Sequence, residues 1–243
     1  MMRVLGFIYS LVFNLNLIST AILILIIMLK NCKIECDNLV VEREINVEDL
    51  KIHYKETSGT STLPLVLLHG YSFSSQTWHT LGTLDLLEKN KIHAYAIDMP
   101  GFGKSTGKRI SLSQPDTLVK FMSTLFEALN IDDLMLLGPS MGGGYAIIYT
   151  ISNPSKVKGL VLVAPAGLDK PFISQHLDKL TMPVLIFWGD KDYVFKIDLG
   201  YTLEKELPNA KLVVCKGAKH PCYLDVPELF HQELIRFIKQ ILS

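Results

Sequence analysis

The residues best suited to chemistry lie in the stretch Gly138-Pro139-Ser140-Met141-Gly142. This stretch separates an apolar run that predicts a strand, Leu134 to Leu137, from a run that predicts a helix, Tyr145 to Ile151. A serine in a sharp turn from a strand into a helix points outward, and glycines two residues to either side leave room for the turn. The pattern predicts a nucleophile elbow, and Ser140 as nucleophile would need a histidine and an acid to activate it.

Candidate partners for Ser140 follow downstream. The run Pro183 to Trp188 predicts a strand, and Asp190 and Asp192 come just after it. The next predicted strand, Ala210 to Lys216, leads into a loop that carries His220. Because open α/β sheets build their sites at the carboxyl ends of the strands, we expect these side chains at the same edge as the elbow. Either aspartate could be the acid.

A further glycine-rich segment, Asp98 to Ser105, follows the predicted strand Ile92 to Ile97. Its Gly-Lys-Ser residues are similar to a phosphate-binding loop, but Asp98 stands where that loop needs its first glycine. We therefore expect no nucleotide, and we also expect no metal ion or organic cofactor. Five other histidines precede the acid, lie off the predicted loops or belong to a C-terminal amphipathic helix, so we expect them at the surface or in packing: His53, His79, His93, His176 and His231.

The composition fits one globular domain and an N-terminal segment. The formal net charge of the 243 residues is zero and the pI is about 7, so the chain has no charge footprint for nucleic acid. From residue 39 onward, apolar strands alternate with amphipathic helices, which predicts one doubly wound, mostly parallel α/β sheet. We therefore divide the chain into residues 1–38 and a domain of residues 39–243.

Over residues 39–243 the chain resembles α/β-hydrolases, in which the order of the triad along the chain is Ser, Asp or Glu, His. It is most similar to the alpha/beta hydrolase domain-containing protein 14 group. In one respect it departs from that group, whose elbow has serines in place of Gly138 and Gly142. The segments that carry the resemblance are His69-Gly70-Tyr71-Ser72-Phe73-Ser74-Ser75, Ala96-Ile97-Asp98-Met99-Pro100-Gly101 and Lys216-Gly217-Ala218-Lys219-His220-Pro221-Cys222-Tyr223-Leu224-Asp225.

The resemblance implies roles for individual residues. The acid of this fold usually lies three residues after the glycine that ends its strand, which favours Asp192 over Asp190. The oxyanion hole would consist of the backbone N–H groups of Tyr71, after the His-Gly pair, and Met141, after the nucleophile. His69 is then expected to have a structural role in its loop.

The resemblance also implies a function. The chain would hydrolyse esters, thioesters or acyl-amides through an acyl-enzyme on Ser140. Its substrates would be small molecules, acylated proteins or lipids. Many α/β-hydrolases carry a cap between the strand that follows the elbow helix and the strand before the acid. Here those predicted strands are Val157 to Pro165 and Pro183 to Trp188, and only residues 167–182 separate them. We therefore expect no cap domain, one short helix within residues 172–180 and an open site. Two alternatives remain, an acyltransferase with the same triad and an inactive binding module of the same fold.

The N-terminal segment has the character of a membrane span. Val4 to Leu29 contains no charged residue, and a helix of about 20 apolar residues is long enough to cross a hydrocarbon core. No small-residue cleavage site follows it at Met28 to Asn31. We therefore expect an uncleaved single-pass anchor. Basic residues flank both of its ends, so the positive-inside bias does not assign a side of the membrane to the catalytic domain.

Overall fold

The described part of the chain is built on one mostly parallel sheet. A computed structural model describes residues 40–243, and the expected membrane anchor lies outside this range. One eight-stranded sheet has the strand order β1-β2-β4-β3-β5-β6-β7-β8. The strands are β1 (Val41–Val47), β2 (Leu50–Glu56), β3 (Leu65–Leu67), β4 (Ala94–Ile97), β5 (Leu134–Pro139), β6 (Val157–Val163), β7 (Val184–Gly189) and β8 (Ala210–Cys215).

Most of this sheet is parallel. Strands β4, β3, β5, β6, β7 and β8 pair in parallel, while β1 and β2 form an antiparallel hairpin whose second strand pairs antiparallel with β4. The parallel strands β3, β4, β5 and β7 are apolar and fully buried, because strands covered on both faces are apolar throughout. The strands β6 and β8 are mostly apolar, and each contains one exposed lysine. The sequence analysis did not predict the hairpin, in which most of β1 is exposed or half-buried.

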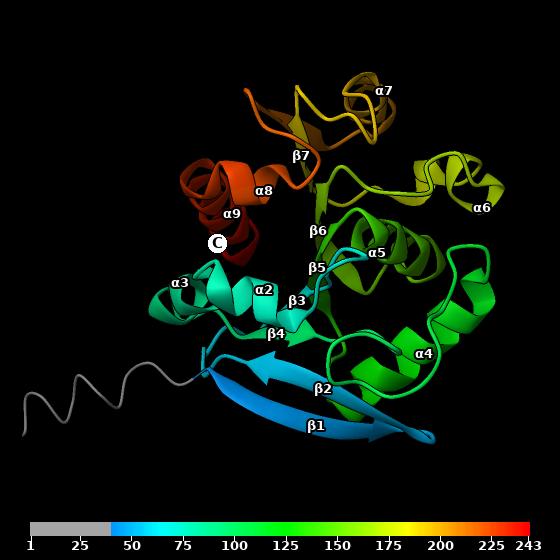
Figure 1. Cartoon of the computed structure of the whole chain (residues 1–243), viewed down its shortest axis with the longest axis vertical. Helices are drawn as coiled ribbons and strands as arrows, with labels where there is room; N and C mark the ends of the chain where they lie inside the picture. Colours follow the sequence, from blue (N-terminus) through cyan, green and yellow to red (C-terminus); the bar gives the residue numbers. More distant parts are fainter. Residues whose placement is uncertain (1–39) are drawn as a thin grey trace, which may run out of the picture. The chain divides into compact units, whose positions relative to one another are not determined.

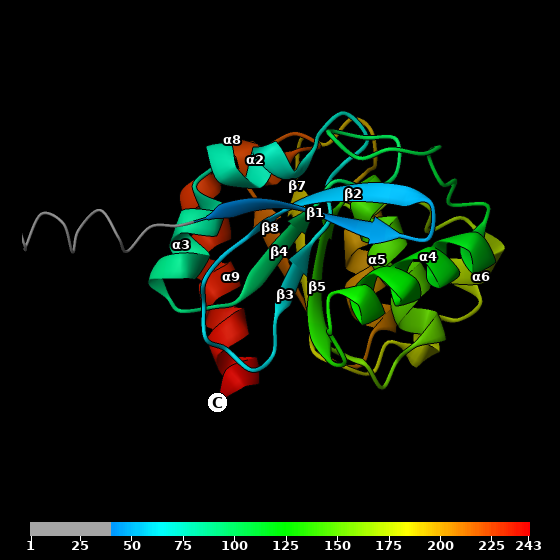
Figure 2. The same cartoon turned by 90° about the horizontal axis from the view of Figure 1, so that it is seen from below.

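Helices cover both faces of the sheet (Figures 1 and 2). One apolar core contains residues of α4, α5 and α7, and a second core on the other face contains residues of α2, α3, α8 and α9. The helices are α2 (Ser75–Thr80), α3 (Thr83–Lys89), α4 (Pro115–Ala128), α5 (Met141–Ser152), α6 (Pro171–Ser174), α7 (Asp198–Glu206), α8 (Cys222–Asp225), α9 (Pro227–Leu242) and the single 3₁₀ turn η1 (Leu177–Lys179).

The central helix α5 is buried along nearly its whole length. It packs between α4 and the strands β5 and β6, so both of its sides contact protein. Three consecutive glycines, Gly142 to Gly144, allow its first turn to approach neighbouring backbone. The position of Ser140, just before this helix, is therefore fixed by the core.

The connection between β6 and β7 is short. It carries only α6 and η1, where the sequence analysis expected one short helix. After α6, His176 Nδ1 lies 2.9 Å from the Phe172 carbonyl oxygen. A continued helix would use that oxygen as a backbone acceptor. Within residues 40–243, no helix combines the length and the apolar character needed to cross a membrane.

Candidate active site

Ser140 occupies a strained turn at the carboxyl end of β5. Its φ is 49° and its ψ is −116°, a backbone conformation that residues other than glycine rarely adopt. Two backbone bonds secure the turn, one from Ser140 N to the Val163 oxygen at 2.8 Å and one from Ala166 N to the Ser140 oxygen at 2.9 Å. Such strain persists only where the surroundings over-determine the backbone, as they do at many functional sites. The elbow geometry that the sequence predicts is present.

The glycines that flank Ser140 lie against backbone. A Cβ atom on Gly138 would lie 2.3 Å from the carbonyl carbon of Gly142. A Cβ atom on Gly142 would lie 2.7 Å from the backbone oxygen of His69. The close contact of α5 with β5 and with the loop after β3 therefore requires both glycines.

Asp192 and His220 are in direct contact. His220 Nδ1 lies 2.7 Å from Asp192 Oδ2, and the side chain of Asp192 is fully buried. Its other oxygen, Oδ1, accepts bonds from the backbone N–H groups of Val194 at 2.8 Å and Phe195 at 2.9 Å. An ionised carboxylate can only accept, so Nδ1 carries the proton and Nε2 is left as the acceptor. This is the tautomer that a general base needs toward a serine.

Asp190 has a different partner. Its Oδ1 accepts a bond of 2.6 Å from Gly217 N, in the loop between β8 and His220, and the residue is exposed. Asp192 is thus the aspartate that contacts His220. No hydrogen bond joins Ser140 to His220 among residues 40–243, although both follow strands at the same sheet edge. In structures without substrate the bond between nucleophile and base is often long.

Two backbone N–H groups are candidates for the oxyanion hole. Met141 is the first residue of α5, and a helix leaves its first N–H groups without intrahelical partners. The Tyr71 N–H has no hydrogen-bond acceptor within the described part of the chain. Both residues line a cavity of about 500 Å³ that Ser140 also lines. They remain predictions for the donors that face a developing oxyanion.

Comparison with known proteins places the chain in a family. A family model described as "Serine aminopeptidase, S33" matches residues 61–173. The rat (Rattus norvegicus) protein named "Putative protein-lysine deacylase ABHD14B" is 36% identical over 180 residues, which cover 73% of this chain and 83% of that protein. The chain belongs to the ABHD14 family of α/β-hydrolases.

Two further comparisons agree with this membership. Protein ABHD14A of Danio rerio is 35% identical over 192 residues, which cover 76% of this chain and 69% of that protein. Among solved structures, a CIB-like hydrolase of Thermoplasma acidophilum superposes with a TM-score of 0.78 at 27% identity and covers 83% of this chain and 99% of its own. The resemblance found in the sequence is confirmed at the level of the family and of the fold.

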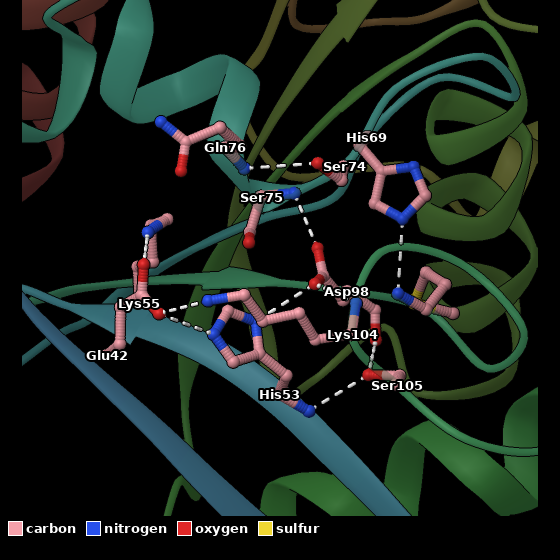
Figure 3. A network of polar contacts seen from close by, with 11 residues as sticks. Glu42, His53, Lys55, His69, Ser74, Ser75, Gln76, Asp98, Lys104 and Ser105 are labelled. Carbon is pink, nitrogen blue, oxygen red and sulfur yellow. Dashed lines mark hydrogen bonds and ion pairs between the residues drawn. The ribbon is translucent and has the colours of Figure 1, made fainter.

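In this ABHD14 family member a polar network is centred on the buried Asp98, at the end of β4 (Figure 3). Asp98, which is 1% exposed, accepts bonds from Ser75 N at 2.6 Å and from Lys104 N at 2.9 Å. Its Oδ2 also lies 2.9 Å from His53 Nδ1. One carboxylate thus joins the start of α2, the glycine-rich loop after β4 and the strand β2.

The network continues outward to Glu42 on β1 (Figure 3). Glu42 contacts Lys55, Lys104 and His53. These partners, Lys104 first, lower the pKa of the Glu42 carboxyl to about 2. Sequence analysis had assigned His53 to the surface or to packing, and the structure buries it between two carboxylates.

His69 has the structural role expected of it. Its Nδ1 donates to the Gly70 oxygen at 2.8 Å, and its Nε2 accepts from Met99 N at 3.1 Å. The ring thus uses both nitrogens in its neutral form, and burial lowers its pKa. His69 thereby joins the loop that carries Tyr71 to the loop after β4.

The described residues contain no cluster of three or more His, Cys, Asp or Glu side chains that could hold a metal ion. Two charged residues, Arg109 and Lys170, line the cavity beside Ser140. Sequence analysis missed both, because they lie in irregular segments without a motif. No local pattern in the sequence would have found them.

Proposed function

We propose that this chain is a serine hydrolase that removes acyl groups from esters, thioesters or acyl-amides. Membership of the ABHD14 family supports the class of reaction, since a relative is named "Putative protein-lysine deacylase ABHD14B". The observation that carries the proposal is the 2.7 Å contact between His220 and the buried Asp192. It leaves His220 Nε2 as an acceptor at the sheet edge where the strained turn presents Ser140.

In the proposed mechanism, His220 takes the proton of Ser140 as the hydroxyl oxygen attacks the acyl carbon. Asp192 holds the imidazole in the required tautomer and stabilises its cationic form. The N–H groups of Tyr71 and Met141 would stabilise the alkoxide, each contributing about 3 to 4 kcal/mol if they act as oxyanion-hole donors do elsewhere. His220 then protonates the leaving group and activates the water that releases the acyl group.

An activity-based fluorophosphonate probe tests this proposal. We expect the chain to be labelled on Ser140 and the Ser140→Ala variant to be unlabelled, with ester hydrolysis lowered by several orders of magnitude. Ser174, on α6, is a matched control, and Ser174→Ala is expected to retain labelling. Unlabelled wild-type protein, or near-normal hydrolysis by Ser140→Ala, would contradict the triad and favour a binding module or another nucleophile.

We further propose that residues 1–38 anchor the enzyme in a membrane as a single span, since Val4 to Leu29 is uncharged. The full chain should remain with membranes after carbonate extraction, and a chain that begins at Leu39 should be soluble and hydrolyse small esters. A mature chain that begins near Cys32 or Cys36 would instead identify a cleaved signal.

A further inference from the structure

The two charged residues that line the cavity beside Ser140 are both cationic. The cavity is about 500 Å³ in volume, and its two charged lining residues are the cations Arg109 and Lys170. No Asp or Glu of residues 40–243 lines it. The nearest acid in sequence, Asp169, lines a neighbouring cavity instead. A substrate acyl group in this cavity would therefore lie near two cationic side chains.

Arg109 is held in place at this cavity. Its Nη1 donates to the Tyr71 hydroxyl at 2.7 Å, and its Nε donates to the Gly101 oxygen at 3.4 Å. Its guanidinium carbon lies 4.3 Å from the ring centre of Phe102 and 4.9 Å from that of Tyr71. Arginine has five N–H donors in a rigid fork, so a guanidinium held in this way keeps donors for a ligand.

The loop that carries Arg109 is fixed to the helix after the nucleophile. Tyr145 of α5 donates its hydroxyl to the oxygen of Ile110, and burial raises the pKa of Tyr145 to about 12. The hydroxyl therefore stays protonated as a donor at neutral pH. Arg109 is thus positioned relative to Ser140 through α5, and relative to the proposed oxyanion donor Tyr71 through the side chain of that tyrosine.

Lys170 reaches the same cavity from a different segment. It is half-buried at the start of α6, where its backbone N–H donates to the Gly167 oxygen at 2.9 Å. Neither Lys170 nor Arg109 forms an ion pair with a carboxylate of residues 40–243. Both cations line one cavity without acidic partners, so an anionic ligand there would attract each of them and offset the repulsion between them.

We propose that Arg109 and Lys170 make this site selective for acyl substrates that carry an anionic group, a carboxylate or a phosphate, close to the scissile bond. The inference rests on the proposed function, because it assigns the substrate class of the same site. Leu112 and Met141 line the cavity as well and offer apolar contact for a short methylene chain between the anion and the acyl carbon. The anion can belong to the acyl group or to the leaving group.

Two pairs of esters distinguish these positions. Mono(4-nitrophenyl) glutarate carries its carboxylate on the acyl side, and its methyl ester is the neutral match. 4-Acetoxybenzoate carries the carboxylate on the leaving group, and methyl 4-acetoxybenzoate is its neutral match. For wild-type protein we expect kcat/KM to favour the anionic member of at least one pair by about tenfold or more, as a charged hydrogen bond would give. The pair that shows this preference locates the anion.

Lys170→Gln is the informative variant, because the Lys170 side chain forms no hydrogen bond or ion pair within residues 40–243. We expect this variant to lower the ratio of anionic to neutral kcat/KM about tenfold, and Lys170→Arg to restore most of the ratio. Arg109→Gln should lower the ratio as well. Lys108 is exposed and does not line the cavity, so Lys108→Gln, which removes the same charge, should leave the ratio unchanged.

The outcomes separate this inference from the proposed function. Hydrolysis of neutral and anionic esters at equal rates, abolished in Ser140→Ala, would uphold the hydrolase and overturn the anion selectivity. If no ester is hydrolysed, the proposed function fails, and calorimetry with wild-type protein decides the selectivity. Tighter binding of monomethyl glutarate than of dimethyl glutarate, lost in Lys170→Gln, would support it. Equal binding, or no binding of either, would overturn it.

Discussion

Replacing Asp192 by asparagine is expected to remove most activity and leave the fold intact. Asparagine keeps an Oδ1 acceptor for the N–H groups of Val194 and Phe195, so the loop after β7 retains both bonds. Its amide NH₂ takes the place of Oδ2, which lies 2.7 Å from His220 Nδ1. Two donors cannot face each other, so the imidazole takes the tautomer with its proton on Nε2 and can no longer accept the proton of Ser140.

The size of the effect follows from the loss of the base. In a known triad the same exchange lowers kcat about 10⁴-fold, and we expect a loss of about 10³- to 10⁴-fold here. The free energy of unfolding should change by less than about 1 kcal/mol, because the amide replaces the carboxylate and alters only the one side-chain contact with His220. The assay is the rate of 4-nitrophenyl acetate hydrolysis at neutral pH, with urea unfolding measured on the same samples.

Asp190→Asn is the matched control. Its Oδ1 accepts from Gly217 N, and asparagine offers the same oxygen, so both rate and stability should stay near those of the wild type. A loss of rate in Asp190→Asn that exceeds the loss in Asp192→Asn would refute the assignment of the acid. A large loss of stability in Asp192→Asn would show that the carboxylate has a structural role, which the two retained N–H bonds argue against.

Two further predictions concern the polar network beside the site. Asp98→Ala leaves Ser75 N, Lys104 N and His53 Nδ1 without their acceptor in the interior, and we expect urea unfolding to show a loss of about 3 to 5 kcal/mol; a loss below about 1 kcal/mol would mean that water replaces the carboxylate. Glu42 has a folded pKa of about 2 against an ordinary value of 4.5, so its contribution to stability is complete above pH 4.5 and is lost as the pH falls toward 2. The difference in melting temperature between wild type and Glu42→Gln should therefore shrink over that pH range, and a difference that stays constant would disprove the contribution of the Glu42 charge.

The parts of the fold that the sequence predicted are those set by local patterns. The parallel strands are mostly apolar runs, and the elbow combines a short motif with the elements on either side of it. The antiparallel hairpin was missed because β1 alternates weakly and is mostly exposed, so its pairing depends on β2 and not on its own residues. The Ser140, Asp192 and His220 assignments and the oxyanion donors stay predictions until activity is measured.

Side chains that depend on distant partners were the hardest to predict. His53 is buried because Asp98, 45 positions away in the sequence, lies against it across the antiparallel pair of β2 and β4. Arg109 reaches the cavity because a loop turns beside Tyr71 and Phe102, and no periodicity marks such a loop. The geometry that separates Asp190 from Asp192 likewise depends on where the loops after β7 and β8 meet.

The paired glycines of the elbow limit how this family can vary. A side chain at Gly138 would meet Gly142, and a side chain at Gly142 would meet the His69 backbone, so neither position can gain a side chain while α5 stays where it is. Serine at either position of this chain would require α5 to move away from β5 or from the loop after β3. A single serine at one of the two positions already requires α5 to shift. The costs of the two substitutions in this chain should therefore not be additive, because one shift of α5 makes room for both side chains.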